Sequence, residues 1–522
     1  MTDTTEAFRH PSAYAVSPIV NALQRDAARP LVEMAGGKVW TAGEILADIS
    51  RYAQALTSRG VSVGARVGLL AGNCVEVLIL HNATGYSGAG LVAMHPMGSA
   101  DDHLFAIEDG QVEALIYDPK KFSARAAELL RRSNRLKTIL ALGDSDVGEN
   151  LFEVAKEFTP GPLVAPQLPP NAVTRLSYSG GTTGKPKAIP GNARVGAMVM
   201  AIMLQEWEWP VNPRILAVVP LSHAGGSLFA PMVLKHGTMV VMPGFDPGAV
   251  LAAIEQYRIT CTMLVPTMIY ALLDHPDFDK YDLSSLETIF YGASLMSPAR
   301  LKEGIERIGP VFFQFYGQAE APMTVTVMRK SEHDPDNPLR MASCGRPVAW
   351  VDVGLLDNDN NPVTDGEPGE ICVRGPLVMD GYLDRDELNK ETFAGGWLHT
   401  GDVAVKDPDG FLRIVDRKKD MIVTGGFNVF PSEVENVIAD HPAVAQVSVF
   451  GVPDEKWGEA VKAAVVLRPG ASVDAAELIA LVREHKGPVQ APKSIAFIDA
   501  IPLTAVGKPD KKALRKQFAE PG

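Results

Sequence analysis

The residues of this chain best suited to chemistry form a short loop rich in glycine, hydroxyl and lysine side chains. The loop reads Leu176-Ser-Tyr-Ser-Gly-Gly-Thr-Thr-Gly-Lys-Pro-Lys187. Glycines let backbone N–H groups approach an anion, Thr182 and Thr183 add hydroxyl donors, and Lys187 adds positive charge. An apolar strand pattern over 172–178 leads directly into the loop. We therefore predict a phosphate-binding loop and not an idle surface turn.

This loop is not the P-loop of nucleoside triphosphatases. Ser179 stands where the first glycine of that loop belongs, and Pro186 where its Mg-binding Ser or Thr belongs. The segment instead resembles the signature YSSGTTGxPKG of the adenylate-forming superfamily, which includes acyl-CoA synthetases, peptide-synthetase adenylation domains and firefly luciferase. Ala188 replaces the family's usual glycine, and Pro190-Gly191-Asn192 replaces its usual hydroxyl and histidine. The resemblance implies that ATP phosphates contact Ser179, Gly180, Gly181, Thr182, Thr183, Gly184 and Lys187.

A second motif implies an acyl-binding site. The stretch Pro220-Leu-Ser-His-Ala-Gly-Gly226 resembles the family's PLFHxxG, whose histidine stands near the carboxylate to be activated. Taken alone, His223 would more often be a structural histidine. The resemblance implies instead that His223, Gly225 and Gly226 contact the acid. The segment has no carboxylate to pair with a substrate amino group, which disfavours an α-amino acid.

Two further motifs imply an adenine and metal site. Gly292-Ala-Ser-Leu-Met296 resembles the GAAPL turn that packs against adenine, and Gln314-Phe-Tyr-Gly-Gln-Ala-Glu320 resembles QGYGMTE. The resemblance implies that Glu320 holds Mg²⁺ on the phosphates. The threonine that contacts the α-phosphate is replaced by Ala319. The implied nucleotide contacts are Gly292, Ala293, Ser294, Gln314, Phe315, Tyr316 and Gly317.

The remaining motifs follow in the family's order. Gly396-Trp-Leu-His-Thr-Gly-Asp402 matches GWxxTGD, in which the Asp accepts hydrogen bonds from both ribose hydroxyls. Asp416-Arg-Lys-Lys-Asp420 resembles DRxK(D/E), which implies that Arg417 reaches the ribose and α-phosphate and that Lys419 is a hinge.

Two motifs near the C-terminus complete the set. The segment from Gly425 and Gly426 to Glu433 resembles the GxNVxPxEVE segment that lines the pantetheine tunnel. Pro502-Leu-Thr-Ala-Val-Gly-Lys508 resembles PxTxxGK, whose lysine binds the carboxylate and α-phosphate during adenylation. The implied catalytic residues are Lys187, His223, Arg417 and Lys508.

Together these motifs imply an ATP-dependent acid-thiol ligase. A small-molecule carboxylic acid and ATP would give acyl-AMP and diphosphate, and the acyl group would pass to coenzyme A. Two alternatives stay open: transfer to an acyl carrier protein, and a weakly active adenylate-binding homologue, because Ala319 and the altered loop exit both change the site. The acid itself, whether aliphatic, aryl or sterol-derived, is not determined by these residues.

The elements that must position these residues alternate between helix and strand. Thr41 and Glu44 form a capping box before an amphipathic run over 45–56. Strand patterns follow at 66–71, 92–95, 114–117, 138–142 and 218–221. Short alternating segments at 351–356, 370–374 and 411–415 indicate an antiparallel subdomain, and helices at 432–440 and 475–485 lie in a compact C-terminal region.

We therefore expect an α/β protein. Its N-terminal adenylation domain, 1–418, would contain layered βα sheets plus the small antiparallel subdomain, and a mobile α+β lid domain would span 419–522.

Composition excludes several function classes. The net charge of −13 disfavours a nucleic-acid partner. The longest apolar run, 195–204, is far shorter than the roughly 20 residues of a transmembrane helix and predicts a core helix. The start of the chain lacks signal-peptide features, so we expect a cytoplasmic protein. Four scattered cysteines without a CxxC pair favour structural thiols. A homodimer is a possible assembly, because it is the most common form of symmetric oligomers.

Overall fold

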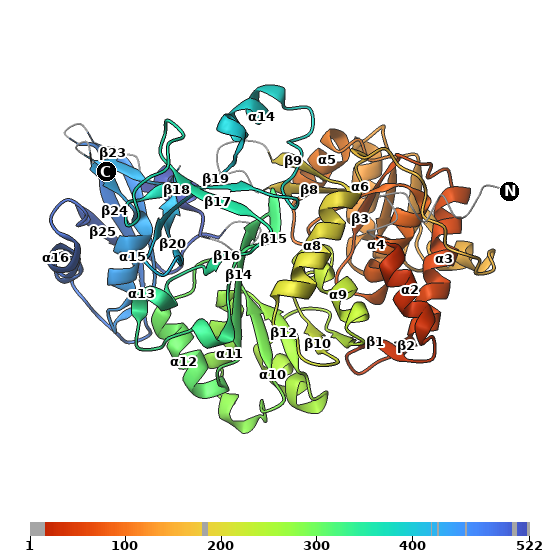
Figure 1. The fold of residues 1–522 in the computed structure, drawn as a ribbon, viewed down its shortest axis with the longest axis horizontal. Helices are drawn as coiled ribbons and strands as arrows, with labels where there is room; N and C mark the ends of the chain where they lie inside the picture. The colour runs from red at the N-terminus through yellow and green to blue at the C-terminus, as the bar shows by residue number, and fades with distance from the viewer. Residues whose placement is uncertain are drawn as a thin grey trace. The chain divides into compact units, whose positions relative to one another are not determined.

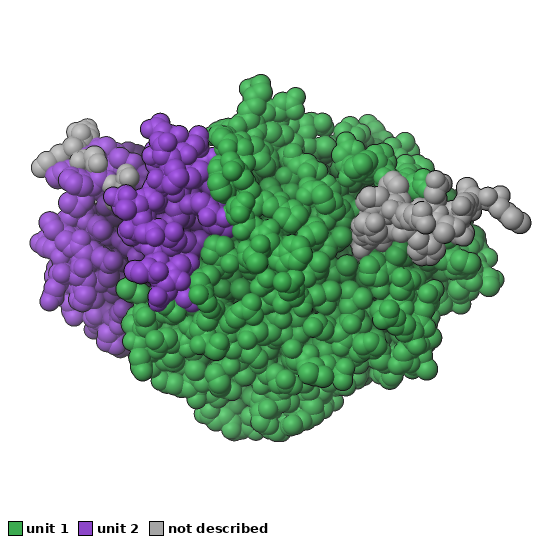
Figure 2. Space-filling view, viewed as in Figure 1, with its two compact units in different colours: residues 1–352, 373–398 green, residues 353–372, 399–522 purple. Residues whose placement is uncertain are grey.

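The computed structural model describes residues 16–179, 186–418, 420–424, 427–454, 457–503 and 509–518. The chain divides into two compact units, which Figure 2 distinguishes by colour: unit 1 comprises 1–352 and 373–398, and unit 2 comprises 353–372 and 399–522. The antiparallel subdomain thus groups with the C-terminal region by its contacts. The predicted boundary after residue 418 separates domains that would move relative to each other, whereas the two units are defined by contacts. That boundary therefore stays a prediction.

A seven-stranded sheet in unit 1 leads to the glycine-rich loop. Its strand order is β7-β6-β5-β3-β4-β8-β9, and every neighbouring pair is parallel except β8 with β9. In chain order its strands are β3 (Arg66–Leu70), β4 (Gly90–Ala93), β5 (Ala114–Tyr117), β6 (Thr138–Ala141), β7 (Glu149–Asn150), β8 (Arg175–Ser179) and β9 (Lys187–Gly191). The strands predicted around 66–71, 114–117 and 138–142 are therefore confirmed.

A nine-stranded sheet in unit 1 carries the other motifs. Its order is β16-β15-β14-β13-β12-β10-β11-β1-β2. In chain order these are β1 (Pro30–Met34), β2 (Val39–Thr41), β10 (Arg214–Ala217), β11 (Thr238–Val241), β12 (Cys261–Leu264), β13 (Thr288–Tyr291), β14 (Phe312–Gln318), β15 (Ala321–Met328) and β16 (Arg346–Pro347). The strand predicted at 218–221 is wrong, because the strand ends at Ala217. Pro220 has no N–H to donate to a ladder, so this apolar run continues as a buried loop.

Helices cover both sheets of unit 1 (Figure 1). Leu251, Ile269 and Leu301, from α10, α11 and α12, share a buried cluster with Leu216 and Ile289 of the nine-stranded sheet. The helices are α2 (Ser17–Arg25), α3 (Ala42–Ser58), α4 (Val75–Ser87), α5 (Ala100–Asp109), α6 (Pro119–Arg132), α7 (Leu151–Lys156), α8 (Ala193–Glu206), α9 (Phe229–Leu234), α10 (Pro247–Gln256), α11 (Pro266–Leu273), α12 (Pro298–Ile308), α13 (Pro338–Met341) and α14 (Asp386–Thr392). None of the helices in the described ranges is long and apolar enough to cross a membrane.

Two local predictions about these helices have different outcomes. The Thr41 side chain caps α3, and Glu44 bonds back to the Thr41 backbone, so the capping box is confirmed. The apolar run at 195–204 does form a helix, α8. Most of its residues are only partly buried, however, and those that are buried are Val195, Ile202, Met203 and Glu206. The helix therefore covers the core and does not lie within it.

Unit 2 combines two small sheets. The four-stranded sheet has the order β17-β18-β19-β20, built from β17 (Asp352–Leu356), β18 (Gly369–Arg374), β19 (Leu398–Lys406) and β20 (Leu412–Arg417). The five-stranded sheet contains β21 (Ile422–Thr424), β22 (Phe427–Val429), β23 (Val444–Asp454), β24 (Gly458–Leu467) and β25 (Ser494–Phe497). Helices α15 (Pro431–Ala439) and α16 (Ala475–Lys486) pack on it through Val434, Ile438 and Leu478, and α17 spans Lys511–Phe518.

Candidate active site

The β8–β9 hairpin frames the glycine-rich loop. Ser179 and Lys187 are paired across the two strands, so the hairpin fixes both ends of the loop. The predicted phosphate contacts Gly180, Gly181, Thr182, Thr183 and Gly184, and the side chain of Ser179, lie outside the described residues. Lys187 is described and opens β9.

Lys187 and Glu320 contact the same tyrosine. The Lys187 ammonium lies 5.0 Å from the ring centroid of Tyr382. The Tyr382 hydroxyl donates a 2.7 Å hydrogen bond to Oε1 of Glu320, whose residue is 7% exposed. Two residues predicted from separate motifs are therefore linked through a third that the motif analysis missed. Tyr382 lies 62 residues from Glu320, and no spacing pattern in the sequence connects them.

The two adenine motifs come together at neighbouring strand ends. β13 and β14 are parallel neighbours, and a Cβ added to Gly292 would lie 2.3 Å from the Phe315 carbonyl oxygen. Only glycine fits this close approach. The next residue, Ala293, has a positive φ of 67°, which turns the chain sharply after the strand. The side-chain oxygen of Gln314 is buried and has no hydrogen-bond partner among the described residues.

His223 lies at the start of a short 3₁₀ segment, Ala224–Leu228. Its Nδ1 is 2.9 Å from Ser222 Oγ, and its ring meets the His95 ring edge to face at 4.8 Å. Burial, together with the nearby His95 and Arg175, lowers the pKa of His223 to about 3. The imidazole is therefore neutral at physiological pH, so its one ring N–H can donate a hydrogen bond to a carboxylate without the ring carrying charge.

Arg175 is a second residue that the motifs did not reveal. One guanidinium N–H donates to the Ser222 carbonyl at 3.2 Å, and Nε is buried without a hydrogen-bond partner in the described part of the chain. No carboxylate of the described residues forms an ion pair with it, and burial lowers its pKa. A buried arginine usually has an acidic partner. This cation instead supports the backbone next to His223.

The residue directly after the acyl motif, Ser227, contacts β15, the strand that begins after Glu320. Ser227 Oγ lies 3.8 Å from the sulfur of Met323, a residue with a positive φ of 66°. A Cβ added to Gly226 would lie 2.2 Å from the Leu221 carbonyl oxygen, so the glycine permits a tight turn after His223. The residues that directly follow the predicted acyl and metal motifs are thus neighbours within unit 1.

Unit 2 brings together the two predicted ribose contacts. Asp402 of β19 and Arg417 of β20 are paired across the antiparallel strands, and Arg417 Nε lies 2.6 Å from Asp402 Oδ1. Asp402 is 4% exposed, and its backbone N–H donates to Thr400 Oγ1 at 3.1 Å. The predicted residues Lys419, Gly425, Gly426 and Lys508 lie outside the described residues.

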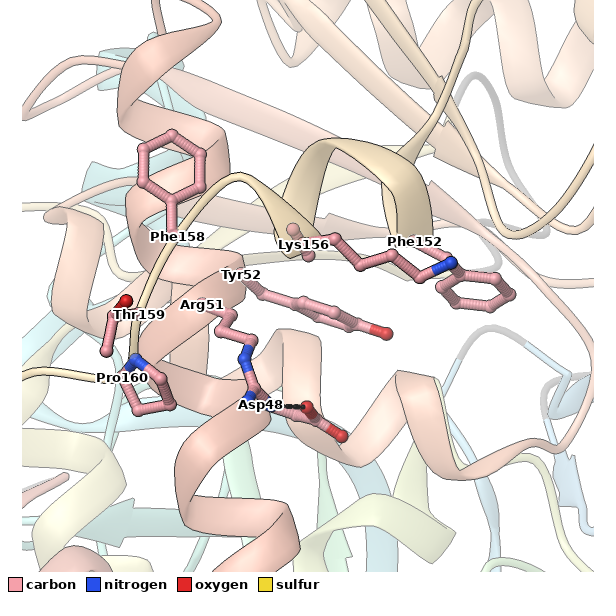
Figure 3. A pocket seen from close by; sticks show the side chains of 9 residues that line it. Asp48, Arg51, Tyr52, Phe152, Lys156, Phe158, Thr159 and Pro160 are labelled. Atoms are coloured by element: carbon pink, nitrogen blue, oxygen red, sulfur yellow. Dashed lines mark hydrogen bonds and ion pairs between the residues drawn. The ribbon is translucent and has the colours of Figure 1, made fainter.

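A surface hollow of ≈ 510 Å³ lies elsewhere in unit 1 (Figure 3). Figure 3 shows Arg51 paired with Asp48, and the Tyr52 ring of α3 on the side of Lys156 and Phe152 of α7. The residues that line the hollow are Asp48, Arg51, Tyr52, Phe152, Ala155, Lys156, Phe158, Thr159 and Pro160. None of the motif residues belongs to this set, so the hollow is separate from the candidate active site.

Comparison with known proteins identifies relatives over nearly the whole chain. A family model described as AMP-binding enzyme matches residues 20–383, and one described as AMP-binding enzyme C-terminal domain matches 433–508. A medium/long-chain-fatty-acid–CoA ligase, FadD8 of Mycobacterium tuberculosis, is 50% identical over 515 residues, covering 96% of this chain and 90% of that protein.

Solved structures agree with this result. The amide bond synthetase McbA from Marinactinospora thermotolerans superposes with a TM-score of 0.89 at 32% identity, over 98% of this chain and 100% of that one. ATP-bound MatB from Rhodopseudomonas palustris superposes with a TM-score of 0.87 at 26% identity, over 96% and 99%.

Proposed function

The chain belongs to the AMP-binding enzyme family, and from this membership we propose that it is an ATP-dependent acyl-CoA synthetase. A carboxylate attacks the α-phosphorus of ATP and diphosphate leaves. The thiol of coenzyme A then attacks the acyl carbonyl of acyl-AMP, which gives acyl-CoA and releases AMP and the thiol proton. Substrate atoms perform both attacks. The protein's contribution is therefore to position the reactants and to stabilise charge.

The observation that carries the proposal is the contact from Lys187 through Tyr382 to Glu320. It joins a cation at the exit of the phosphate-binding loop to a buried carboxylate in the neighbouring motif. Such an arrangement suits a triphosphate with a bound divalent cation, because the lysine can attract phosphate oxygens while the carboxylate binds the metal.

Two observations support a fit to MgATP. The buried oxygen of Gln314, which no donor of the described residues reaches, can accept a hydrogen bond, and the adenine amino group is a donor. No hydrogen bond from the described residues reaches Oε2 of Glu320, which leaves that oxygen able to bind a cation. Mg²⁺ held by Glu320 would offset the charge of the phosphates.

We assign the other residues by the family motifs that they match. Ser179 to Gly184 bind the leaving diphosphate, His223 with Gly225 and Gly226 contacts the acid, and Asp402 and Arg417 bind the ribose. Lys508 stabilises charge at the α-phosphate, and Gly425 with Gly426 admits the pantetheine of coenzyme A. Lys419 is the hinge between an adenylation domain, 1–418, and a mobile domain, 419–522.

The proposed acid is a medium- or long-chain fatty acid. FadD8, named for such acids, shares half of its aligned residues with this chain. The small residues Ala224, Gly225 and Gly226 next to His223 also leave room for an acyl chain. A cytoplasmic location and a homodimer stay predictions.

A panel of acids tests the proposal. Fatty acids of increasing length, aryl acids and sterol-derived acids would each be assayed for AMP release with ATP and coenzyme A. We expect fatty acids to give the highest kcat/KM and acyl-CoA to form in step with AMP. Parallel assays would replace coenzyme A by a holo-carrier protein or, because of the similarity to McbA, by an amine. Faster turnover with either acceptor, or no acid-dependent AMP release, would overturn the proposal.

A further inference from the structure

A carboxylate, a thiol and an imidazole meet on the four-stranded sheet of unit 2. Glu370 and Cys372 are two residues apart on β18, so their side chains point to the same face. His399 lies on the neighbouring strand β19. Glu370 and Cys372 are buried and His399 is partly buried. One oxygen, the sulfur and one ring nitrogen all lie within 4.8 Å of one another.

The distances from His399 to the other two side chains are close to those of a tetrahedral zinc site. His399 Nδ1 lies 3.4 Å from Cys372 Sγ and 3.0 Å from Glu370 Oε2. With ordinary zinc–ligand bond lengths and tetrahedral angles, sulfur and nitrogen ligands lie about 3.5 Å apart and nitrogen and oxygen ligands about 3.3 Å apart. Shifts of a few tenths of an ångström would therefore bring the histidine into position with both other ligands.

The carboxylate of Glu370 is already held in its charged form. Burial alone would raise its pKa, but hydrogen bonds from His399, Lys418 and the Gly401 N–H lower it below the usual value. Lys418 Nζ lies 3.0 Å from Oε2, and the Gly401 N–H donates to Oε1 at 2.8 Å. The Cys372 thiol differs, because burial raises its pKa to about 12. Without a metal the thiol is protonated, and a bound divalent cation would displace its proton to solvent. His399 would bind the cation through Nδ1 as the neutral tautomer that carries its proton on Nε2, so its Nδ1 hydrogen bond to Glu370 would be replaced by the metal.

We propose that Glu370, Cys372 and His399 bind a zinc-class divalent cation and that this cation displaces Lys418 from Glu370. Thiolate and imidazole ligands select such metals over Mg²⁺, which prefers oxygen ligands. Lys418 and the metal carry the same sign of charge and compete for one carboxylate oxygen. The Lys418 side chain is 45% exposed, so its ammonium can move into water with little loss of stabilising free energy.

The site gives a role to one of the cysteines predicted from sequence to be structural. All four cysteines are free thiols, and Cys74 is the one that is only partly buried. Among the described residues, the Glu370, Cys372 and His399 group is the one cluster of three such side chains with metal-ligand spacing. The proposal does not depend on the reaction that the chain catalyses.

Titration with Co²⁺ tests the site directly. The full-length protein would be treated with a chelator, freed of it, and titrated with Co²⁺ in the presence of excess Mg²⁺. We expect one equivalent of Co²⁺ to produce the intense thiolate-to-cobalt absorption band and the visible bands of a tetrahedral complex, and Zn²⁺ to abolish them. The absence of a thiolate band would overturn the proposal.

Variants locate the site and test the displacement of the lysine. Cys372→Ser and His399→Gln should abolish the thiolate band or weaken the binding of Co²⁺ at least about tenfold, whereas Cys74→Ser should leave both unchanged. Lys418→Gln should tighten Co²⁺ binding several-fold, because the competing cation is gone. Melting curves of each metal-free variant would verify that it folds. A band that survives Cys372→Ser, or Lys418→Gln binding no tighter than the parent, would contradict the assignment.

Discussion

The hydroxyl of Tyr382 donates a 2.7 Å hydrogen bond to the buried carboxylate of Glu320. The bond fixes one oxygen of the carboxylate and orients the other, while the same tyrosine ring lies under the Lys187 ammonium. Tyr382 is thus a positioning residue for the two groups that the proposed function assigns to MgATP.

Tyr382→Phe should impair the use of MgATP while the protein stays folded. Hydrogen bonds to charged groups contribute about 1.5–3 kcal/mol, so we expect kcat/KM for ATP to fall at least about tenfold and the Mg²⁺ concentration for half-maximal rate to rise. Acid-dependent diphosphate–ATP exchange measures both. Tyr257→Phe is the matched control, since it also removes a 2.7 Å hydrogen bond, which the Gly36 N–H donates to the Tyr257 hydroxyl. Equal effects of the two substitutions would refute the positioning role.

Asp402 should account for discrimination between ATP and 2′-deoxy-ATP. If its carboxylate accepts a hydrogen bond from the 2′-hydroxyl, the parent enzyme prefers ATP, and Asp402→Ala loses most of that preference along with affinity for ATP. The ratio of the two kcat/KM values in diphosphate exchange is the measurement. Asp365→Ala, which removes a surface carboxylate paired with Lys406, serves as the control. An unchanged ratio in Asp402→Ala would rule out the ribose assignment.

Gly292→Ala should disturb the nucleotide site through the backbone. The added methyl would lie 2.3 Å from the Phe315 carbonyl oxygen, so β13 and β14 must separate at the adenine motif. We expect a lower melting temperature and a KM for ATP raised at least about tenfold. Gly244→Ala is the control, because its methyl would meet no atom of the described residues within 4 Å. If Gly292→Ala behaved like Gly244→Ala, the close approach of Gly292 to the Phe315 carbonyl would not be needed for ATP binding.

Stability should fall as the pH decreases below about 6.5. Burial lowers the pKa of His81 and His223 to about 3 and that of His333 to about 4, from an ordinary value of 6.5. The unfolded chain takes up protons on these histidines below about pH 6.5, whereas the folded chain does not until near their lowered values, so protonation favours unfolding in this window. Melting temperatures between pH 8 and pH 5 check this. In His333→Gln the melting temperature should decline less steeply as the pH decreases. A decline as steep as that of the parent would contradict this contribution of His333.

Lys508→Ala should separate the two half-reactions. The lysine is assigned to the α-phosphate during adenylation only, so diphosphate exchange should be abolished while thioester formation from supplied acyl-AMP is largely retained. The exposed Lys512 of α17 provides a control at Lys512→Ala, with both steps unchanged. Equal loss of both half-reactions in Lys508→Ala would argue against a domain movement that exchanges Lys508 for the Gly425–Gly426 face.

The sequence by itself determined the features that depend on neighbouring residues. The capping box of Thr41 and Glu44 and the strand Ala114–Tyr117 follow from short-range spacing, because turn chemistry and side-chain periodicity act within a few residues. Periodicity failed at 218–221, where an apolar run also fits a buried loop. The resemblance of the motifs predicted the residues around Gly292, Glu320 and Asp402.

Only the tertiary structure decided which distant side chains meet. Tyr382 reaches Glu320, Arg175 reaches Ser222, and His399 reaches both Glu370 and Cys372. These pairs lie on different strands or loops, and strand order and register bring them within hydrogen-bond distance. Neither order nor register is encoded in local spacing, since both depend on how whole sheets pack their apolar faces. The positioning tyrosine, the buried arginine and the proposed metal ligands therefore became visible only in the fold.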